Sequence, residues 1–228
     1  MDELMMWGWN VSCCRWQVVV FWLLAITGCL VDLGSKEWVF AALPEEDFSS
    51  PEQYAGAHHS QYIGAHHTLW QASGDNTDNQ LVPPGFHLHI AYRVDAEGHQ
   101  VPHVNQGALF GLGGQAWGGV ANGVFALVSL VVAVALGLYV TLKSLDLGWL
   151  LTLALGLIAG GAVGNLVDRV RFAGVRDFLH WNFLFDWPIF NLADVFLVIG
   201  AGLILLAGIL APPPTKKLLV PQATGTEA

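Results

Sequence analysis

Long apolar runs alternate with polar segments along this 228-residue chain. Four runs with almost no charged side chains are each long enough, at about 1.5 Å rise per residue, to cross a bilayer as a helix. The pattern predicts membrane-spanning helices at about residues 12–33, 118–142, 147–167 and 187–210. A polar stretch, 37–102, separates the first two helices. The segment 211–228 opens on a run of prolines and predicts a disordered tail.

Composition supports a membrane protein. Hydrophobic residues make up 54% of the chain and charged residues 12%, with a mean hydropathy of +0.51, whereas soluble domains carry about 25% charged residues. The net charge of −9 and the absence of a basic cluster argue against a nucleic-acid partner. The sequence therefore predicts an all-α polytopic membrane protein with four transmembrane helices and with membrane lipids around it.

The polar stretch 37–102 holds the only strand signals. Apolar residues alternate over Phe86–Val94, a second short run covers Gly98–Val104, and the turn between them suits an antiparallel hairpin. Between Ser49 and Gln80 the sequence predicts little order. Most of the nine histidines lie in the stretch 37–102, and the pairs His58–His59 and His66–His67 permit a transition-metal or pH-sensing role. Solvated loop histidines are the simpler interpretation, and no metal site is predicted.

The three cysteines lie in or beside the first apolar run. Cys13, Cys14 and Cys29 form no Cys-x-x-Cys pattern, so they indicate neither a disulfide framework nor a thiolate metal site. The sequence Ile26-Thr27-Gly28-Cys29 resembles a lipobox and leaves open a lipoprotein precursor cleaved at Cys29. Acidic and aromatic residues before Arg15, and three further apolar runs, argue against that alternative.

One carboxylate stands inside the last apolar run. Asp194 would cost about 2.5–3.5 kcal/mol near a bilayer centre, so it is expected to face a partner or a water-filled site. With Asp186 as cap and Pro188 in the first turn, a helix from Trp187 would carry Asn191 on the same face as Asp194. The same Asn-x-x-Asp pattern ends the third run, at Asn165 to Asp168.

Carboxylates gather at one predicted membrane face. They are Asp32, Asp168, Asp177 and Asp194. Arg169 can neutralise Asp168 locally and Arg176 adjoins Asp177, while Lys36 follows Asp32 at the i+4 spacing of a helical ion pair. Two close carboxylates in a low-dielectric site share a proton, so that one activates water and the other donates a hydrogen bond to a carbonyl. The same groups could instead bind a cation or relay protons in a carboxylate-lined transporter.

Five sequence blocks follow one another along the chain: Asp32-x-x-x-Lys36, the block from Asn105 to Gly111, Gly164 to Arg169, Val175 to Phe178, and Phe190 to Asp194. Together, in this order, they resemble bacterial lipoprotein signal peptidase, also called signal peptidase II. Each stands at the expected end of one of the four apolar runs. The resemblance covers the membrane core and leaves out most of residues 37–102.

The resemblance implies an intramembrane aspartyl endopeptidase of the bacterial inner membrane, with cytoplasmic termini and an active site near the extracytoplasmic face. Such an enzyme acts without a cofactor on prolipoproteins and cleaves before the diacylglyceryl-modified cysteine. The catalytic pair maps onto Asp177 and Asp194. Substrate-binding or supporting roles map onto Asp32, Lys36, Asn105, Gly107, Asn165, Asp168, Arg169, Asn191 and Ala193. The family is the target of the cyclic peptide antibiotic globomycin, and we expect a monomer.

The chain departs from the family in its first external loop. The family has a short β-cradle there, and the longer polar stretch 37–102 predicts a cradle enlarged by a His-rich insertion. The charge of the loops is nearly balanced between the two sides, so it favours cytoplasmic termini only weakly.

Overall fold

The computed structural model of the chain describes residues 3–43, 63–71, 85–94, 100–107, 114–143 and 147–211. Predictions for the tail after residue 211, for the His58–His59 pair, for the turn at 95–98 and for the block after Gly107 fall outside these residues.

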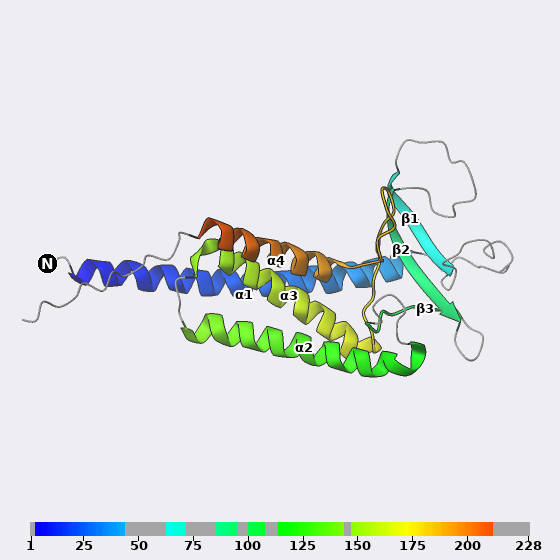
Figure 1. Ribbon diagram of the computed structural model, residues 1–228, viewed down its shortest axis with the longest axis horizontal. Helices are drawn as coiled ribbons and strands as arrows, with labels where there is room; N and C mark the ends of the chain where they lie inside the picture. The colour runs from blue at the N-terminus through cyan, green and yellow to red at the C-terminus, as the bar shows by residue number, and fades with distance from the viewer. Residues whose placement is uncertain are drawn as a thin grey trace, which may run out of the picture.

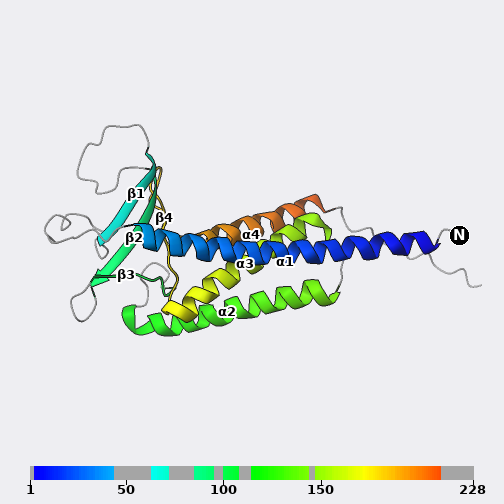
Figure 2. The ribbon, with the colours of Figure 1, turned by 180° about the vertical axis from the view of Figure 1, so that it is seen from behind.

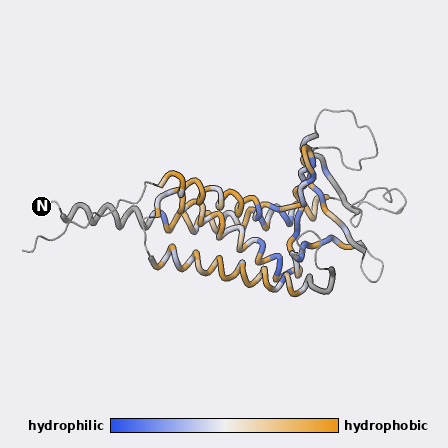
Figure 3. The backbone as a smooth tube through the Cα atoms, viewed as in Figure 1, coloured by the Kyte–Doolittle hydropathy of each residue, from blue (hydrophilic) through white to orange (hydrophobic). Residues whose placement is uncertain are grey.

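Four long helices form a bundle. They are α1 (Glu3–Ala42), α2 (Gly114–Lys143), α3 (Gly148–Phe172) and α4 (Leu192–Leu210). Each contains a stretch long and apolar enough to span a membrane: Trp16–Ala42, Gly119–Leu142, and all of α3 and α4. Figures 1 and 2 show the helices side by side, with α1 starting and α4 ending at the end opposite a small sheet. Hydrophobic residues cover most of the bundle, and hydrophilic ones gather toward the sheet (Figure 3). The predicted four-helix membrane fold is confirmed.

Helix α3 packs against all three other helices because small residues let their backbones approach. A Cβ on Gly160 would lie 2.9 Å from the carbonyl oxygen of Ala25 in α1. On the other side, a Cβ on Gly161 would collide with the carbonyl oxygen of Ala193 in α4. Glycines in the third apolar run thus allow α1 and α4 to approach α3 closely.

The ends of all four helices differ from the predicted ones, and two of these differences bear on the site. Helix α1 continues to Ala42, because Lys36 is fully buried among carboxylates and does not mark the end of the apolar helix. Helix α4 begins at Leu192 with Asn191 as its cap, so the predicted start at Trp187 was wrong. Pro188 lies instead in an extended connection, in which the Phe190 and Leu179 backbones pair at 2.8 and 2.9 Å.

A four-stranded antiparallel sheet sits at one end of the bundle. Its strands are β1 (Ile63–Gln71), β2 (Gly85–Val94), β3 (Gln100–Pro102) and β4 (Leu179–Trp181). Strand β2 pairs with β1 along one edge, and with β4 and β3 along the other. The predicted pairing of the strands around Phe86–Val94 and Gly98–Val104 is confirmed. The prediction of little order throughout Ser49–Gln80 was wrong, because β1 forms there against the long β2.

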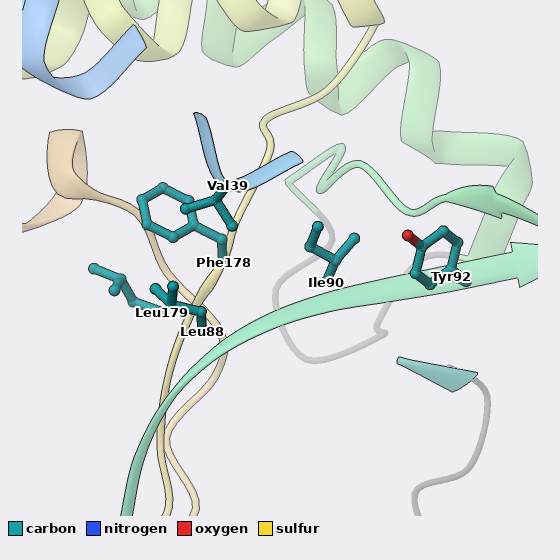
Figure 4. Packing of buried hydrophobic residues seen from close by; sticks show 6 residues of the cluster. All are labelled: Val39, Leu88, Ile90, Tyr92, Phe178 and Leu179. Atoms are coloured by element: carbon teal, nitrogen blue, oxygen red, sulfur yellow. The ribbon is translucent and has the colours of Figure 1, made fainter. Parts of the chain in front are cut away.

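The sheet is joined to the bundle by a hydrophobic cluster, shown in Figure 4. Its buried members are Val39, Leu88, Ile90, Tyr92, Phe178 and Leu179. Val39 comes from the last turns of α1, and the alternate residues of β2 supply the inward face of the sheet. This cluster fixes the segment after α3, which contains Asp177, against the end of the bundle.

Candidate active site

Two extended hydrogen-bonded contacts hold Asp177 in place beside the start of α4. The backbones of Asn105 and Val175 form a bridge, with N–O distances of 2.7 and 2.8 Å. Three residues after Val175, the Phe178 N–H donates to the Phe190 carbonyl at 2.9 Å. Helix α3 ends at Phe172 and its cap, Ala173, takes a left-handed conformation that turns the chain back across the bundle.

Two asparagines bind the Asp177 carboxylate. Asn105 Nδ2 donates to Oδ2 at 2.9 Å, and Asn191 Nδ2 donates to Oδ1 at 2.6 Å. The pKa of Asp177 is raised to about 7, because burial and, to a smaller extent, the nearby charge of Asp194 outweigh the lowering effect of the two amide donors. Near neutral pH the protonated and ionised forms of this carboxyl are therefore both populated.

Asp194 occupies the third position of α4, where it belongs to a capping box. The Asp194 N–H donates to Asn191 Oδ1 at 3.1 Å, and the Asn191 N–H donates to Asp194 Oδ2 at 3.3 Å. The other carboxylate oxygen accepts from Asn165 Nδ2 at 2.9 Å. A carboxylate at a helix N-terminus is also favoured by the helix dipole. Asn191 thus contacts both carboxylates and sets their relative position.

A buried charge network lies beneath the two carboxylates. Lys36 Nζ contacts Asp32 Oδ2 at 2.7 Å, Asp168 Oδ2 at 3.3 Å and Asn165 Oδ1 at 3.2 Å. Asp168 also binds the Arg176 guanidinium at 2.9 Å. Lys36, Asp32 and Asp168 are fully buried. Removing one partner of such a network leaves an uncompensated buried charge, which costs about 3–5 kcal/mol.

The network reaches α4 through Asp32. Its Oδ1 accepts from the Ala193 N–H at 2.9 Å, which satisfies one of the free N–H groups at the start of that helix. A Cβ on Gly164 would collide with the Asp32 carboxylate, so only glycine allows this approach. Asp32 therefore positions the first turn of α4, and with it Asp194.

Arg169 and Gly107 complete the surroundings, and both rest on α2. The Arg169 guanidinium lies 5.1 Å from the centre of the Phe125 ring, and its Nη1 donates to Asn122 Oδ1 at 3.3 Å. The same Phe125 ring fills the space where a Cβ of Gly107 would lie, and Gly107 has φ +89°. The Gly107 N–H donates to Asn105 Oδ1 at 2.8 Å, which orients the amide that binds Asp177.

The structure brings together all the residues singled out from the sequence, although some partners differ. Arg169 was expected to neutralise Asp168, but Asp168 pairs with Lys36 and Arg176. Arg176 adjoins Asp177 in the sequence, yet its guanidinium binds Asp168 and, at 3.1 Å, Glu37. The predicted Asp32–Lys36 ion pair forms, but deep in the bundle.

Sequence reasoning missed three contributors. Arg176 could have been found, since it directly precedes Asp177 and is the only cation of its block. Asn122 and Phe125 carried no signal, because a lone amide and a lone aromatic ring in an apolar run are ordinary packing residues. Among the residues that the structure describes, no group of three or more His, Cys, Asp or Glu side chains is arranged to hold a metal ion.

Known proteins match the chain in sequence and in fold. The family model Signal peptidase (SPase) II matches residues 24–210. A lipoprotein signal peptidase of Dichelobacter nodosus is 43% identical over 104 residues, which cover 45% of this chain and 66% of that protein. One from Halothermothrix orenii is 44% identical over 103 residues, covering 45% of this chain and 63% of that protein. The matched stretch thus spans slightly less than two thirds of these relatives.

A solved bacterial membrane enzyme, determined by the in meso method at 2.3 Å resolution, shares the fold. Its TM-score is 0.51 at 23% identity, covering 82% of this chain and 85% of that one. A second such structure, at 1.9 Å, gives a TM-score of 0.53 at 22% identity, covering 83% and 92%. At these identities the likeness concerns the fold alone. The family match contains every predicted site residue from Asp32 to Asp194, and the chain belongs to the signal peptidase II family.

Proposed function

We propose that this protein removes the signal peptides of lipoprotein precursors, with Asp177 and Asp194 as an aspartyl catalytic pair. One observation carries the proposal. A partly buried carboxyl with a pKa raised to about 7 lies beside a second carboxylate, and asparagine amides hold both in place. Paired carboxyls that share one proton can hydrolyse a peptide bond without a cofactor.

The two carboxyls take different roles. Asp194, the ionised partner, accepts a proton from water while the water oxygen bonds to the scissile carbonyl carbon. Asp177 carries the shared proton and donates it in a hydrogen bond to the carbonyl oxygen, which becomes negative in the transition state. When the tetrahedral intermediate collapses, the C–N bond breaks and the leaving amine takes up a proton from the pair. The side-chain amides of Asn105, Asn165 and Asn191 hold the two carboxyl groups in their relative positions.

The remaining polar residues support this chemistry. Asp32, Lys36 and Asp168 hold the start of α4 and the end of α3 together, through the contacts described above. Arg169 and Gly107 border the carboxyl pair and line the substrate side. Ala193 presents the N–H that Asp32 accepts.

The carboxyl pair lies at one end of the membrane bundle, a location that suits a substrate that is itself membrane-bound. We assign the sheet end to the extracytoplasmic face of the bacterial inner membrane and both termini to the cytoplasm. The substrate is a prolipoprotein carrying a diacylglyceryl-modified cysteine, cut directly before that cysteine. The polar asparagine set and the family match favour this peptidase over a transporter. Cys29 lies inside helix α1, which disfavours cleavage there.

The proposal is tested with the full chain in phospholipid nanodiscs and a prolipoprotein, with and without the diacylglyceryl group. Mass spectrometry of the products is expected to show cleavage directly before the modified cysteine, unaffected by a metal chelator and inhibited by globomycin. The unmodified precursor is expected to remain intact. Absence of cleavage, or cleavage at another bond, would contradict the proposal.

A further inference from the structure

One end of the sheet carries an aromatic group that the proposed chemistry does not use. We call it the aromatic tip, and its members are Trp70, Phe86, Trp181, Phe183, Phe185 and Trp187. Trp70 stacks on Trp181 with ring centres 6.2 Å apart, and Phe183 meets Trp70 edge-on at 5.2 Å. The rings of Trp70, Phe86, Trp181 and Phe183 form one contact group that joins β1, β2 and the segment after β4, and Phe185 and Trp187 form a second pair on that segment.

Strand register places the tip on the bundle side of the sheet. Phe86 alternates with Leu88 and Ile90, which pack against the bundle. Trp70 and Trp181 lie directly opposite Phe86 on the two neighbouring strands. A β-bulge at Leu69 makes this possible, because without the extra residue Leu69 would face Phe86 in place of Trp70.

The tip is exposed although it is apolar. Trp70 is 47% exposed, Phe185 56% and Trp187 52%. The part of the sheet that holds it projects sideways past α4, beyond the support of the bundle (Figures 1 and 2). Its bundle-side face thus overhangs the region that surrounds the four apolar helices.

The charge of the tip points to the partner. Within residues 179–190, all of which the structure describes, Asp186 is the only acidic side chain, and Lys and Arg are absent. Asp186 binds His180 Nε2 at 2.7 Å. Such a surface cannot attract a phosphate-rich or acidic partner. Aromatic residues with few charges are typical of the membrane–water interface, where Trp rings sit at the headgroup level.

The connection to α4 sets the depth of the tip. Trp187 precedes Leu192, the first residue of the apolar α4, by five positions, and the Trp187 N–H donates to the Trp181 carbonyl at 2.9 Å. The tip therefore lies close to the level at which α4 enters the bilayer. We propose that the aromatic tip docks onto the lipid surface beside α4 and anchors the sheet to the membrane. This proposal does not rest on the peptidase chemistry.

The test measures where the tip tryptophans lie in a bilayer. The full chain is labelled with 5-fluorotryptophan and placed in phosphatidylcholine nanodiscs. The fluorine resonances of Trp70, Trp181 and Trp187 are identified by their loss in the single Trp→Phe variants. Paramagnetic relaxation is then recorded with a spin label on carbon 5 of the lipid acyl chain, and separately with a water-soluble gadolinium chelate. Trp22, 43% exposed within the span of α1, serves as the lipid-contact reference.

We expect the lipid label to relax the tip resonances about as strongly as it relaxes the Trp22 resonance. The chelate is expected to relax the tip resonances several-fold less than the lipid label does. The Asp194→Asn chain is expected to give the same result. Strong relaxation by the chelate together with none from the lipid label would overturn the proposal. Protection from the chelate that appears only after a precursor peptide is added would also overturn it, since the tip would then be a peptide-binding surface.

Discussion

The raised pKa of Asp177 predicts a specific dependence of stability on pH. An unfolded aspartate has a pKa of 3.8, whereas that of Asp177 is about 7 in the folded protein. Between these values the folded state keeps a proton that the unfolded state has lost, so stability falls as pH rises, and it levels off above pH 7. At 1.36 kcal/mol per unit, the total loss is about 4 kcal/mol, of which about 3 kcal/mol falls between pH 5 and pH 8.

The substitution Asp177→Asn removes this titration. The new amide must turn one N–H toward Asn105 or Asn191, which costs about 1–3 kcal/mol at every pH. The informative quantity is therefore the change between the two pH values, and not the stability at either one. The variant is expected to gain about 3 kcal/mol relative to the wild type on going from pH 5 to pH 8.

Thermal unfolding of the purified protein at pH 5 and pH 8 measures this change. Glu37→Gln is the matched control, because Glu37 is 57% exposed and its loss should leave the pH dependence of the wild type intact. If the stability difference between the wild type and Asp177→Asn were the same at both pH values, the argument for a proton held on Asp177 would be refuted.

Three further predictions concern the neighbours of the pair. In a pH–rate profile of precursor cleavage, kcat/KM is expected to fall as pH rises through about 7, and Asn105→Leu, which removes a donor to the carboxylate, should move that limb up by about 1 unit. Thermal unfolding of Lys36→Met should show a loss of about 3–5 kcal/mol, since buried Asp32 loses its cation and Asp168 keeps only Arg176, and an unchanged midpoint would contradict the network. Gly107→Ala should lower kcat/KM about tenfold or more because of its positive φ and the Phe125 ring, with partial rescue by Phe125→Leu; full activity would argue against the contact.

The bundle and the position of one buried carboxylate, Asp194, could be predicted from the sequence for physical reasons. A helix that spans a bilayer needs a long apolar run, so the four helices can be identified from the four apolar runs of the sequence. A carboxylate inside such a run is expensive, which singled out Asp194 before any geometry was known. Asn191 followed from its helical spacing to Asp194, and the structure gives it contacts to both carboxylates.

Other features depend on contacts that sequence spacing does not encode. Strand β1 contains glycine and histidine, and it forms because β2 offers a long partner edge. The start of α4 was misplaced since Pro188 and Asp186 suit a helix start as well as they suit an extended connection. The partners of Asp168 were misassigned because adjacent residues of a helix point in different directions. Arg169 points toward Asn122 of α2, whereas Asp168 faces Lys36 of α1 and Arg176. Phe125 contacts Arg169 and Gly107, which lie on separate segments of the chain, so no local sequence pattern could have indicated these contacts.

The central claim is that Asp177 and Asp194 together carry out peptide-bond hydrolysis. The most direct test is single-turnover cleavage of a diacylglyceryl-modified precursor in nanodiscs by the wild type, Asp177→Asn and Asp194→Asn, with Asp186→Asn as the control. Asp186 is 71% exposed and lies outside the pair, so its variant should cleave at the wild-type rate. Loss of either catalytic carboxyl is expected to slow cleavage by about 10²–10⁴-fold or more while the protein stays folded in the membrane. Cleavage at the wild-type rate by a folded Asp177→Asn or Asp194→Asn chain would contradict the claim.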